Sequence, residues 1–224
     1  MTTDQIYTII QYAVAKNVQN GYVSPDDFNL TLMPVAQSSY LDYLLGQYQQ
    51  YQNGRPMARV EFGQTEKIRQ SISPLIYGVI LSPDMTGVAT YPSDFEQVDA
   101  MWSLYNIYNI RFVQQDRLSS YYRSGIDPVS DNPIYLVNQA GFQFYPEDIG
   151  AAKMSYVRTP PPIVWGYTED GNGIPVYSVA LSQQPVWQDY DIFQIIVRAL
   201  SLVGCNLQLG VVMGYAEQIK NGGS

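Results

Sequence analysis

Residues 152–165 read AKMSYVRTPPPIVW, a strand-like segment that runs into three prolines and ends at a tryptophan. Polar and apolar side chains alternate from Lys153 to Val157, which predicts a β-strand. Proline has no N–H to donate to a β-ladder, so the strand must leave its sheet by Pro160. Successive prolines favour a stiff, extended polyproline conformation whose carbonyls need donors from elsewhere. We therefore expect this segment to lead from a sheet into a projecting arm, residues 158–178.

The predicted arm is apolar and aromatic around a glycine-rich tip. Its apolar side chains are Ile163, Val164, Trp165, Tyr167, Ile174, Val176 and Tyr177. Two arrangements are open: the arm folds back over its own sheet, or it docks on a neighbouring subunit or another protein by strand addition or aromatic anchoring. The candidate interaction residues are Arg158, Pro160, Pro161, Pro162, Trp165, Tyr167 and Tyr177.

Helical patterns occupy both ends of the chain. Residues 1–54 predict a helical hairpin, in which Ser24 caps the second helix and Pro34 breaks or kinks it. Residues 184–224 predict two helices, one ending at Gly204 and one over 207–220. The first of these is apolar nearly all round, so we expect it to be buried. Residues 55–83 form a linker of undetermined structure, because Pro74 interrupts their helical spacing.

The middle of the chain, residues 84–183, predicts a β-rich insertion that carries the arm. Strands are predicted at 88–91, 98–108, 134–137, 141–145 and 153–157, with one short helix at 114–123. Turn-forming residues separate them. The terminal helices each have an apolar face to bury and most simply pack together. The predicted fold class is α+β: a helical bundle formed by the N- and C-terminal helices, with an inserted β-rich domain and an extended proline-rich arm.

The composition indicates extensive protein contacts. Only 14% of the 224 residues are charged, whereas 20 are tyrosine, and interface cores are likewise poor in charge and rich in aromatic rings. The net charge of −8 argues against tight nucleic-acid binding, which depends on clustered cations. The only basic run, from Arg55 to Arg69, is diluted by Glu61 and Glu66 and predicts a solvated or partner-facing segment.

Residues suited to catalysis or cofactor binding are scarce. The chain has no histidine, the commonest general base and transition-metal ligand. The single Cys205 excludes an internal disulfide and predicts an inert buried thiol. Four acidic pairs lie at turns or helix starts, where carboxylates accept backbone N–H groups: Asp94/Glu96, Glu147/Asp148, Glu169/Asp170 and Asp189/Asp191. We predict no catalytic residue, no cofactor and no metal site.

The strongest apolar run, residues 192–216, is long enough to cross a bilayer. It contains Gln194, Arg198, Asn206 and Gln208, so a buried helix pair is predicted in its place. The N-terminal sequence MTTDQIYTII lacks the cationic start of a signal peptide. We expect no membrane partner.

The order of several short motifs resembles a known family. The motifs are Ser24-Pro25-Asp26-Asp27-Phe28-Asn29, Ala36-Gln37 followed by Tyr40 to Leu45-Gly46, Tyr91-Pro92-Ser93-Asp94-Phe95, Tyr156-Val157-Arg158-Thr159-Pro160 with Trp165 downstream, Leu202-Val203-Gly204 and Tyr215-Ala216-Glu217. In this order they resemble the head-to-tail connector (adaptor or ring) proteins of tailed bacteriophages, and are most similar to those of short-tailed crAss-like phages.

The resemblance implies a non-enzymatic virion protein of the phage neck, assembled in the cytoplasm of the bacterial host. It implies a homo-oligomeric ring of about twelve copies, joined by heterologous contacts, that binds the portal protein and neighbouring ring or tail proteins. Double-stranded DNA would pass through the channel without specific binding, since acidic walls repel phosphates. By the same resemblance the helices form the ring body, and the C-terminal end or the arm docks on the portal or the next ring. Trp165 and Tyr167 are predicted to anchor an inter-subunit contact.

Three other functions remain open from the sequence. Tyr, Trp, Asn and Gln also line sugar sites, so the protein could be an extracellular carbohydrate- or receptor-binding module. A second alternative is another phage tail component, such as a tail-tube or tail-hub protein. A carboxylate-based glycosidase would need two acidic residues that are each essential for turnover.

Overall fold

The computed structural model describes residues 1–17, 21–52, 62–105, 108–123, 125 and 127–204. These residues form both helices and sheets, which confirms the predicted α+β class. The chain divides into two compact units, Met1–Pro74 with Pro160–Ser224, and Leu75–Thr159. We name them the helical unit and the β unit. The insertion therefore comprises residues 75–159 instead of 84–183, and the proline-rich arm belongs to the helical unit.

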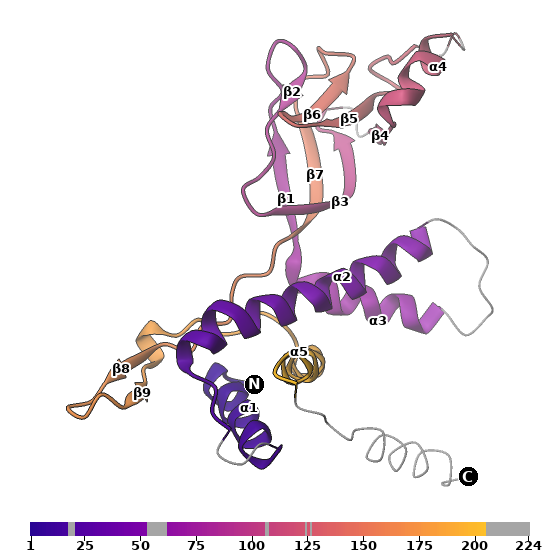
Figure 1. Ribbon diagram of the computed structural model, residues 1–224. Coiled ribbons are helices and arrows are strands. Elements are labelled where there is room, and N and C mark those ends of the chain that lie inside the picture. The colour runs from indigo at the N-terminus through magenta and orange to yellow at the C-terminus, as the bar shows by residue number, and fades with distance from the viewer. Residues whose placement is uncertain (18–20, 53–61, 106–107, 124, 126, 205–224) are drawn as a thin grey trace, which may run out of the picture. The chain divides into compact units, whose positions relative to one another are not determined.

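The helical unit is built from α1 (Thr3–Asn17), the π-helical turn η1 (Asp27–Leu32), α2 (Met33–Gln52), α3 (Phe62–Ile72) and α5 (Asp189–Leu202), shown in Figure 1. Ser24 caps the second helical segment as predicted: its hydroxyl accepts the Asp27 N–H at 3.0 Å and donates to the Asp27 carboxylate at 2.7 Å. The predicted irregularity at Pro34 is the π-helical turn before it, which accommodates a residue without an N–H.

Apolar packing joins the helices of this unit. α2 contacts α3 and α5, and α1 contacts α5. Its fully buried apolar side chains include Ile6, Ile10, Phe28, Met33, Ile192 and Ile195. Burial of each such side chain stabilises the fold by roughly 1.5–3 kcal/mol. Segments from the two ends of the chain therefore share one core.

Helix α5 departs from its predicted environment. Ile192, Ile195 and Ala199 are buried. On the other side of the helix, Phe193 is 52% exposed and Val197 is 43% exposed. The prediction of burial all round was wrong for Phe193 and Val197, because α1 and α2, which make the main contacts with α5, pack on its other side.

The first sheet of the β unit has the strand order β1-β7-β3 and is antiparallel. Strand β7 (Ala152–Arg158) is central, so the predicted strand at 153–157 is confirmed. Strand β1 (Ile76–Leu81) lies in the segment that we predicted as a linker. Pro74, in a short 3-10 turn, separates α3 from β1, so the helical spacing on its two sides belongs to two different elements.

The second sheet has the order β2-β6-β5-β4, made by β2 (Val88–Ala89), β4 (Arg111–Phe112), β5 (Ile134–Asn138) and β6 (Gly141–Tyr145). Strand β3 (Phe95–Ser103) is shorter at its end than predicted, because the chain turns after Ser103. The predicted short helix is a 3-10 turn (Gln115–Arg117) followed by α4 (Leu118–Arg123). The predicted helix at 207–220, Cys205, Arg55 and Arg59 lie outside the described residues.

An aromatic core connects the two sheets of the β unit. Phe142 packs edge-on against Tyr91 at 4.6 Å and Phe95 at 5.3 Å, and the same cluster includes Met154 of β7. Gly141, at the start of β6, has φ of 148°, and a Cβ there would come within 2.0 Å of the Ala89 carbonyl oxygen. Only glycine permits this close approach of two strands.

Candidate interaction surfaces

The three prolines of the arm are held by a helix of the same chain. The Gln37 side-chain amide on α2 donates to the Pro161 carbonyl at 3.2 Å and accepts the Ile163 N–H at 3.2 Å. Gln37 is only 2% exposed, and a buried amide needs such partners. For Pro161, the donor that the polyproline carbonyls were expected to require is therefore provided within the subunit.

Trp165 fixes the base of the arm. Its N–H donates to the Asn29 amide oxygen at 2.7 Å, and the Asn29 side chain donates to the Trp165 carbonyl at 3.1 Å. The indole N–H donates to the Asp4 carboxylate at 3.0 Å, and the ring stacks on Tyr7 at 4.3 Å. Trp165 is 5% exposed. The base of the arm thus folds back, but onto α1 and η1 and not onto a sheet.

The predicted interaction residues Tyr167 and Tyr177 lie beside Trp165. Their ring centroids are 5.9 and 5.7 Å from that of Trp165. The Tyr167 hydroxyl donates to the Asp26 carboxylate at 3.1 Å, and this bond raises the pKa of Tyr167. The Tyr177 hydroxyl accepts from the Gln184 amide at 3.2 Å. Both tyrosines are half-buried, so part of each ring remains open to another molecule.

Arg158 does not belong to the helical unit but to the β unit. Its guanidinium stacks over the Tyr77 ring at 4.0 Å. Its buried Nε has no hydrogen-bond partner among the described residues. The structure therefore brings together Trp165, Tyr167 and Tyr177, whereas Arg158 is part of the other unit.

The tip of the arm is a β-hairpin of β8 (Tyr167–Glu169) and β9 (Pro175–Tyr177), which extends away from α1 and α2 in Figure 1. The Asp170 carboxylate accepts the Ile174 N–H at 2.9 Å and the Asn172 N–H at 2.8 Å, and these bonds lower the pKa of Asp170. Ile174 is 57% exposed and Val176 is 49% exposed. A turn with its own internal hydrogen bonds therefore presents apolar side chains to solvent.

A groove lies between α2, α3 and α5 of the helical unit. It has a volume of about 440 Å³ and is lined by Tyr40, Tyr43, Leu44, Gln47, Lys67, Ile68, Ser71, Tyr190 and Gln194. The Lys67 ammonium lies 4.3 Å from the centre of the Tyr190 ring. Arg198 covers Tyr40 at 4.9 Å and Tyr43 at 5.1 Å. The groove thus combines aromatic walls with cations held over their faces.

A buried hydrogen bond holds one of the tyrosines that line the groove. The Tyr40 hydroxyl donates to the Asp191 carboxylate at 2.6 Å, and Asp191 is 1% exposed. Burial, and then this bond, raise the pKa of the Tyr40 hydroxyl. Asp191 lies in the first turn of α5, where the helix dipole favours a negative charge. The arrangement fixes the Tyr40 ring in the wall of the groove.

Sequence reasoning missed this groove. One of its walls is α3, in the segment predicted as a linker, and another contains Tyr190 and Gln194 of α5, which do not belong to the apolar stripe of that helix. The sequence did contain a signal for its α3 wall, because Lys67 and Ile68 lie within the helical spacing that precedes Pro74.

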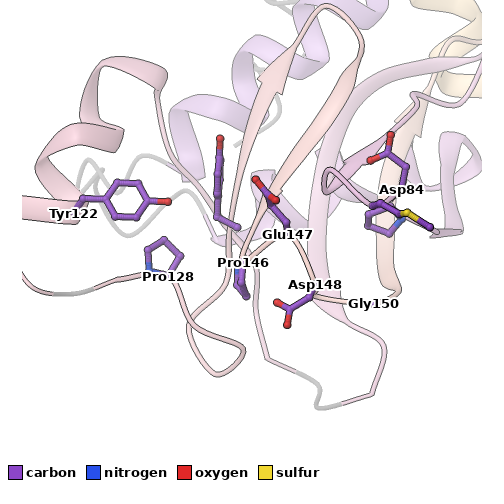
Figure 2. A pocket seen from close by; sticks show the side chains of 10 residues that line it. Asp84, Tyr122, Pro128, Pro146, Glu147, Asp148 and Gly150 are labelled. Atoms are coloured by element: carbon purple, nitrogen blue, oxygen red, sulfur yellow. The ribbon is translucent and has the colours of Figure 1, made fainter.

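The β unit has a separate hollow of about 800 Å³, shown in Figure 2. Tyr122, Tyr145 and three prolines line it together with the carboxylates of Glu147 and Asp148. In this view Glu147 lies between Tyr122 on one side and Asp84 on the other. Burial and the nearby Tyr145 raise the pKa of Tyr122. The hollow combines aromatic rings with exposed acids.

Several of the acidic pairs have structural partners. Asp94 accepts the Tyr156 hydroxyl at 2.8 Å, Asp170 closes the hairpin turn, and Asp189 pairs with the N-terminal amine. Among the described residues, no group of three or more Cys, Asp or Glu side chains is arranged to hold a metal ion. None of the helices in the described part of the chain is long and apolar enough to cross a bilayer.

Comparison with known proteins identified no relative. No protein-family model matches the chain, and no match is found among curated proteins. The functional argument therefore depends on the surfaces described above and on the order of the sequence motifs.

Proposed function

We propose that the protein is a subunit of a head-to-tail connector ring that joins the portal of a tailed bacteriophage to its tail. The observation that supports this proposal is that the arm has a buried base and an exposed apolar tip. Trp165 fixes its base to the protein's own helices, whereas Ile174 and Val176 at its tip are about half exposed. A lone molecule gains nothing from holding apolar side chains in water, but a subunit surrounded by neighbours can bury them.

Other exposed apolar side chains support the same proposal. Phe193 and Val197 form an exposed stripe on α5, and Leu30 is 78% exposed on η1. Together with the few charges and many tyrosines, these side chains match the composition of interface cores. A protomer that contacts neighbours on two sides and layers above and below would bury several such surfaces.

In this proposal the helical unit is a bundle that forms the ring body, and the β unit and the arm contact other components. The partners are further copies of the chain, about twelve in a closed ring, together with the portal and a neighbouring ring or tail protein. The net charge of −8 per copy would give a channel that repels DNA and lets it pass. The role is structural, within the virion neck, and requires no catalytic residue, cofactor or metal.

The test is native mass spectrometry of the purified protein, alone and mixed with the portal of the same phage. The expected result is one closed, high-order oligomer that adds to the portal as a unit. A protein that stays monomeric in both samples would contradict the proposal.

A second candidate is a carbohydrate- or receptor-binding module, which the hollow of the β unit favours. Tyr rings that can stack on sugar faces lie there beside carboxylates that can accept hydroxyl hydrogen bonds. This function predicts glycan binding on an array, lost in Tyr145→Ala and retained in Tyr12→Ala, a change at an exposed residue of α1. An array without any binding would exclude glycans as ligands of the hollow.

A further inference from the structure

We infer that the tip of the arm of one copy docks in the α2–α3–α5 groove of the next copy. This inference depends on the proposed ring and identifies the contact that would join its subunits.

The arm is suited to such a contact because its base is rigid and its tip is apolar. The hydrogen bonds of Gln37 and Asn29 and the stack of Trp165 on Tyr7 fix the base within the subunit. Ile174 directly precedes β9 and Val176 lies within it, and both side chains are about half exposed. A pre-organised apolar hairpin loses little conformational entropy on docking.

The groove is suited to receive these side chains. Its volume of about 440 Å³ lies within the roughly 300–1,000 Å³ of pockets that hold ligands. Leu44, Ile68 and the tyrosine rings give an apolar floor and walls. Docking of an apolar hairpin would bury Tyr43 and Tyr190, which are 52% and 55% exposed, and interfaces concentrate their binding energy in aromatic pockets that become buried in this way.

Charge favours this pairing. The segment 160–188 carries Glu169 and Asp170 and no lysine or arginine. The residues that line the groove include Lys67 and no carboxylate, and Arg198 lies next to Tyr40 and Tyr43. Lys67 can therefore meet Glu169 of the arriving hairpin, and complementary charge of this kind selects the partner and the register.

The positions of the two surfaces favour contact between copies over contact within one subunit. The base of the arm is bonded to Asn29 of η1 and Gln37 of α2, and the groove begins at Tyr40 of α2. The hairpin of β8 and β9, however, extends away from α2 and α3 in Figure 1, so the tip does not reach the groove of its own subunit. The arm and the groove are different surfaces of one subunit, so the contact is heterologous and can repeat around a closed ring.

Cysteine cross-linking tests this contact. The full chain with Cys205→Ala would carry Ile174→Cys at the tip and Gln47→Cys at the edge of the groove, and would be oxidised mildly. The expected result is a ladder of disulfide-linked oligomers on a non-reducing gel, lost on reduction. The matched control combines Ile174→Cys with Tyr12→Cys on α1, where 69% exposure gives an accessible thiol away from the groove, and should give no ladder.

Native mass measurement of the same unoxidised samples separates the two proposals. A ring with no ladder, when both thiols react with a maleimide, overturns this contact and leaves the ring. A tip thiol that cross-links only to added portal also overturns it. The absence of any ring contradicts the proposed function and this inference together.

Discussion

The base and the tip of the proline-rich arm belong to one apolar segment but have opposite environments. Trp165 at the base is 5% exposed, hydrogen-bonded to Asn29 and Asp4 and stacked on Tyr7, whereas Ile174 at the tip is 57% exposed. Hydrophobicity alone does not distinguish them. They differ in their hydrogen bonds. At the base, the Asn29 side chain of η1 bonds to the backbone of Trp165, whereas at the tip the backbone N–H groups bond to Asp170 of the hairpin itself. We conclude that the base stabilises the subunit and that the tip is free to bind another chain.

The largest expected effect on stability is at the base. Trp165→Ala removes a buried indole, its stack on Tyr7 and its bond to Asp4, so the free energy of unfolding should fall by about 3–5 kcal/mol. Urea denaturation measures this change. Ile174→Ala at the tip is the matched control and should change stability by less than about 0.5 kcal/mol. Equal losses in the two variants would remove the distinction between base and tip.

A smaller loss is expected at Asn29. Its side chain both accepts from and donates to the Trp165 backbone, so Asn29→Ala leaves a buried N–H and carbonyl without partners and should cost about 1–3 kcal/mol. Thermal unfolding followed by circular dichroism measures it. Asn172→Ala, which removes the same side chain at the exposed turn, should leave the melting temperature nearly unchanged. A neutral Asn29→Ala would mean that the bonds of Gln37 and Asp4 and the stack on Tyr7 are sufficient to hold the base.

Substitutions in the contact between tip and groove should change ring assembly and not the stability of the subunit. Lys67→Glu places a negative charge opposite Glu169 and should weaken ring formation severalfold, since exposed ion pairs contribute about 0.2–1 kcal/mol each. Adding Glu169→Lys should restore much of the loss, and the dissociation constant from analytical ultracentrifugation reports both changes. Failure of the second substitution to restore assembly would show that Lys67 acts through Tyr190 alone.

The smallest expected effect concerns pH. Backbone N–H bonds from Ile174 and Asn172 lower the pKa of Asp170 in the folded hairpin. A lowered pKa means that the ionised form stabilises the turn at neutral pH, and that this stabilisation is lost as the pH falls below the usual 3.8. The protection of the Ile174 amide against hydrogen exchange, relative to the rate of an unstructured chain at the same pH, should therefore fall only in that acidic range. A loss of protection that begins near pH 6 would assign the turn to another group.

Features with a local cause could be predicted from the sequence. The Ser24 cap, the strand before Pro160 and the hairpin residues of the arm depend on neighbours in the chain. The terminal helices could be predicted from their spacing, although the exposed stripe of α5 could not, because it depends on which helices pack on the other side.

Features that depend on distant partners could not be predicted. Strand β1 has two exposed apolar side chains, Tyr77 and Ile80, so it lacks the alternation that identifies a half-buried strand. The docking of Trp165 needs Asp4 and Asn29, which are more than 130 residues away in the sequence. The groove requires three helices at once, and it includes α3 from the segment that had no clear pattern.

The most direct test of the account compares the mass in solution of two proteins by light scattering: the unchanged chain, and a variant with Ile174→Lys and Val176→Lys at the tip. The account predicts a closed ring of about twelve 25.3 kDa subunits for the first, and a monomer with an unchanged melting temperature for the second. Two proteins of identical mass, whether both rings or both monomers, would contradict it.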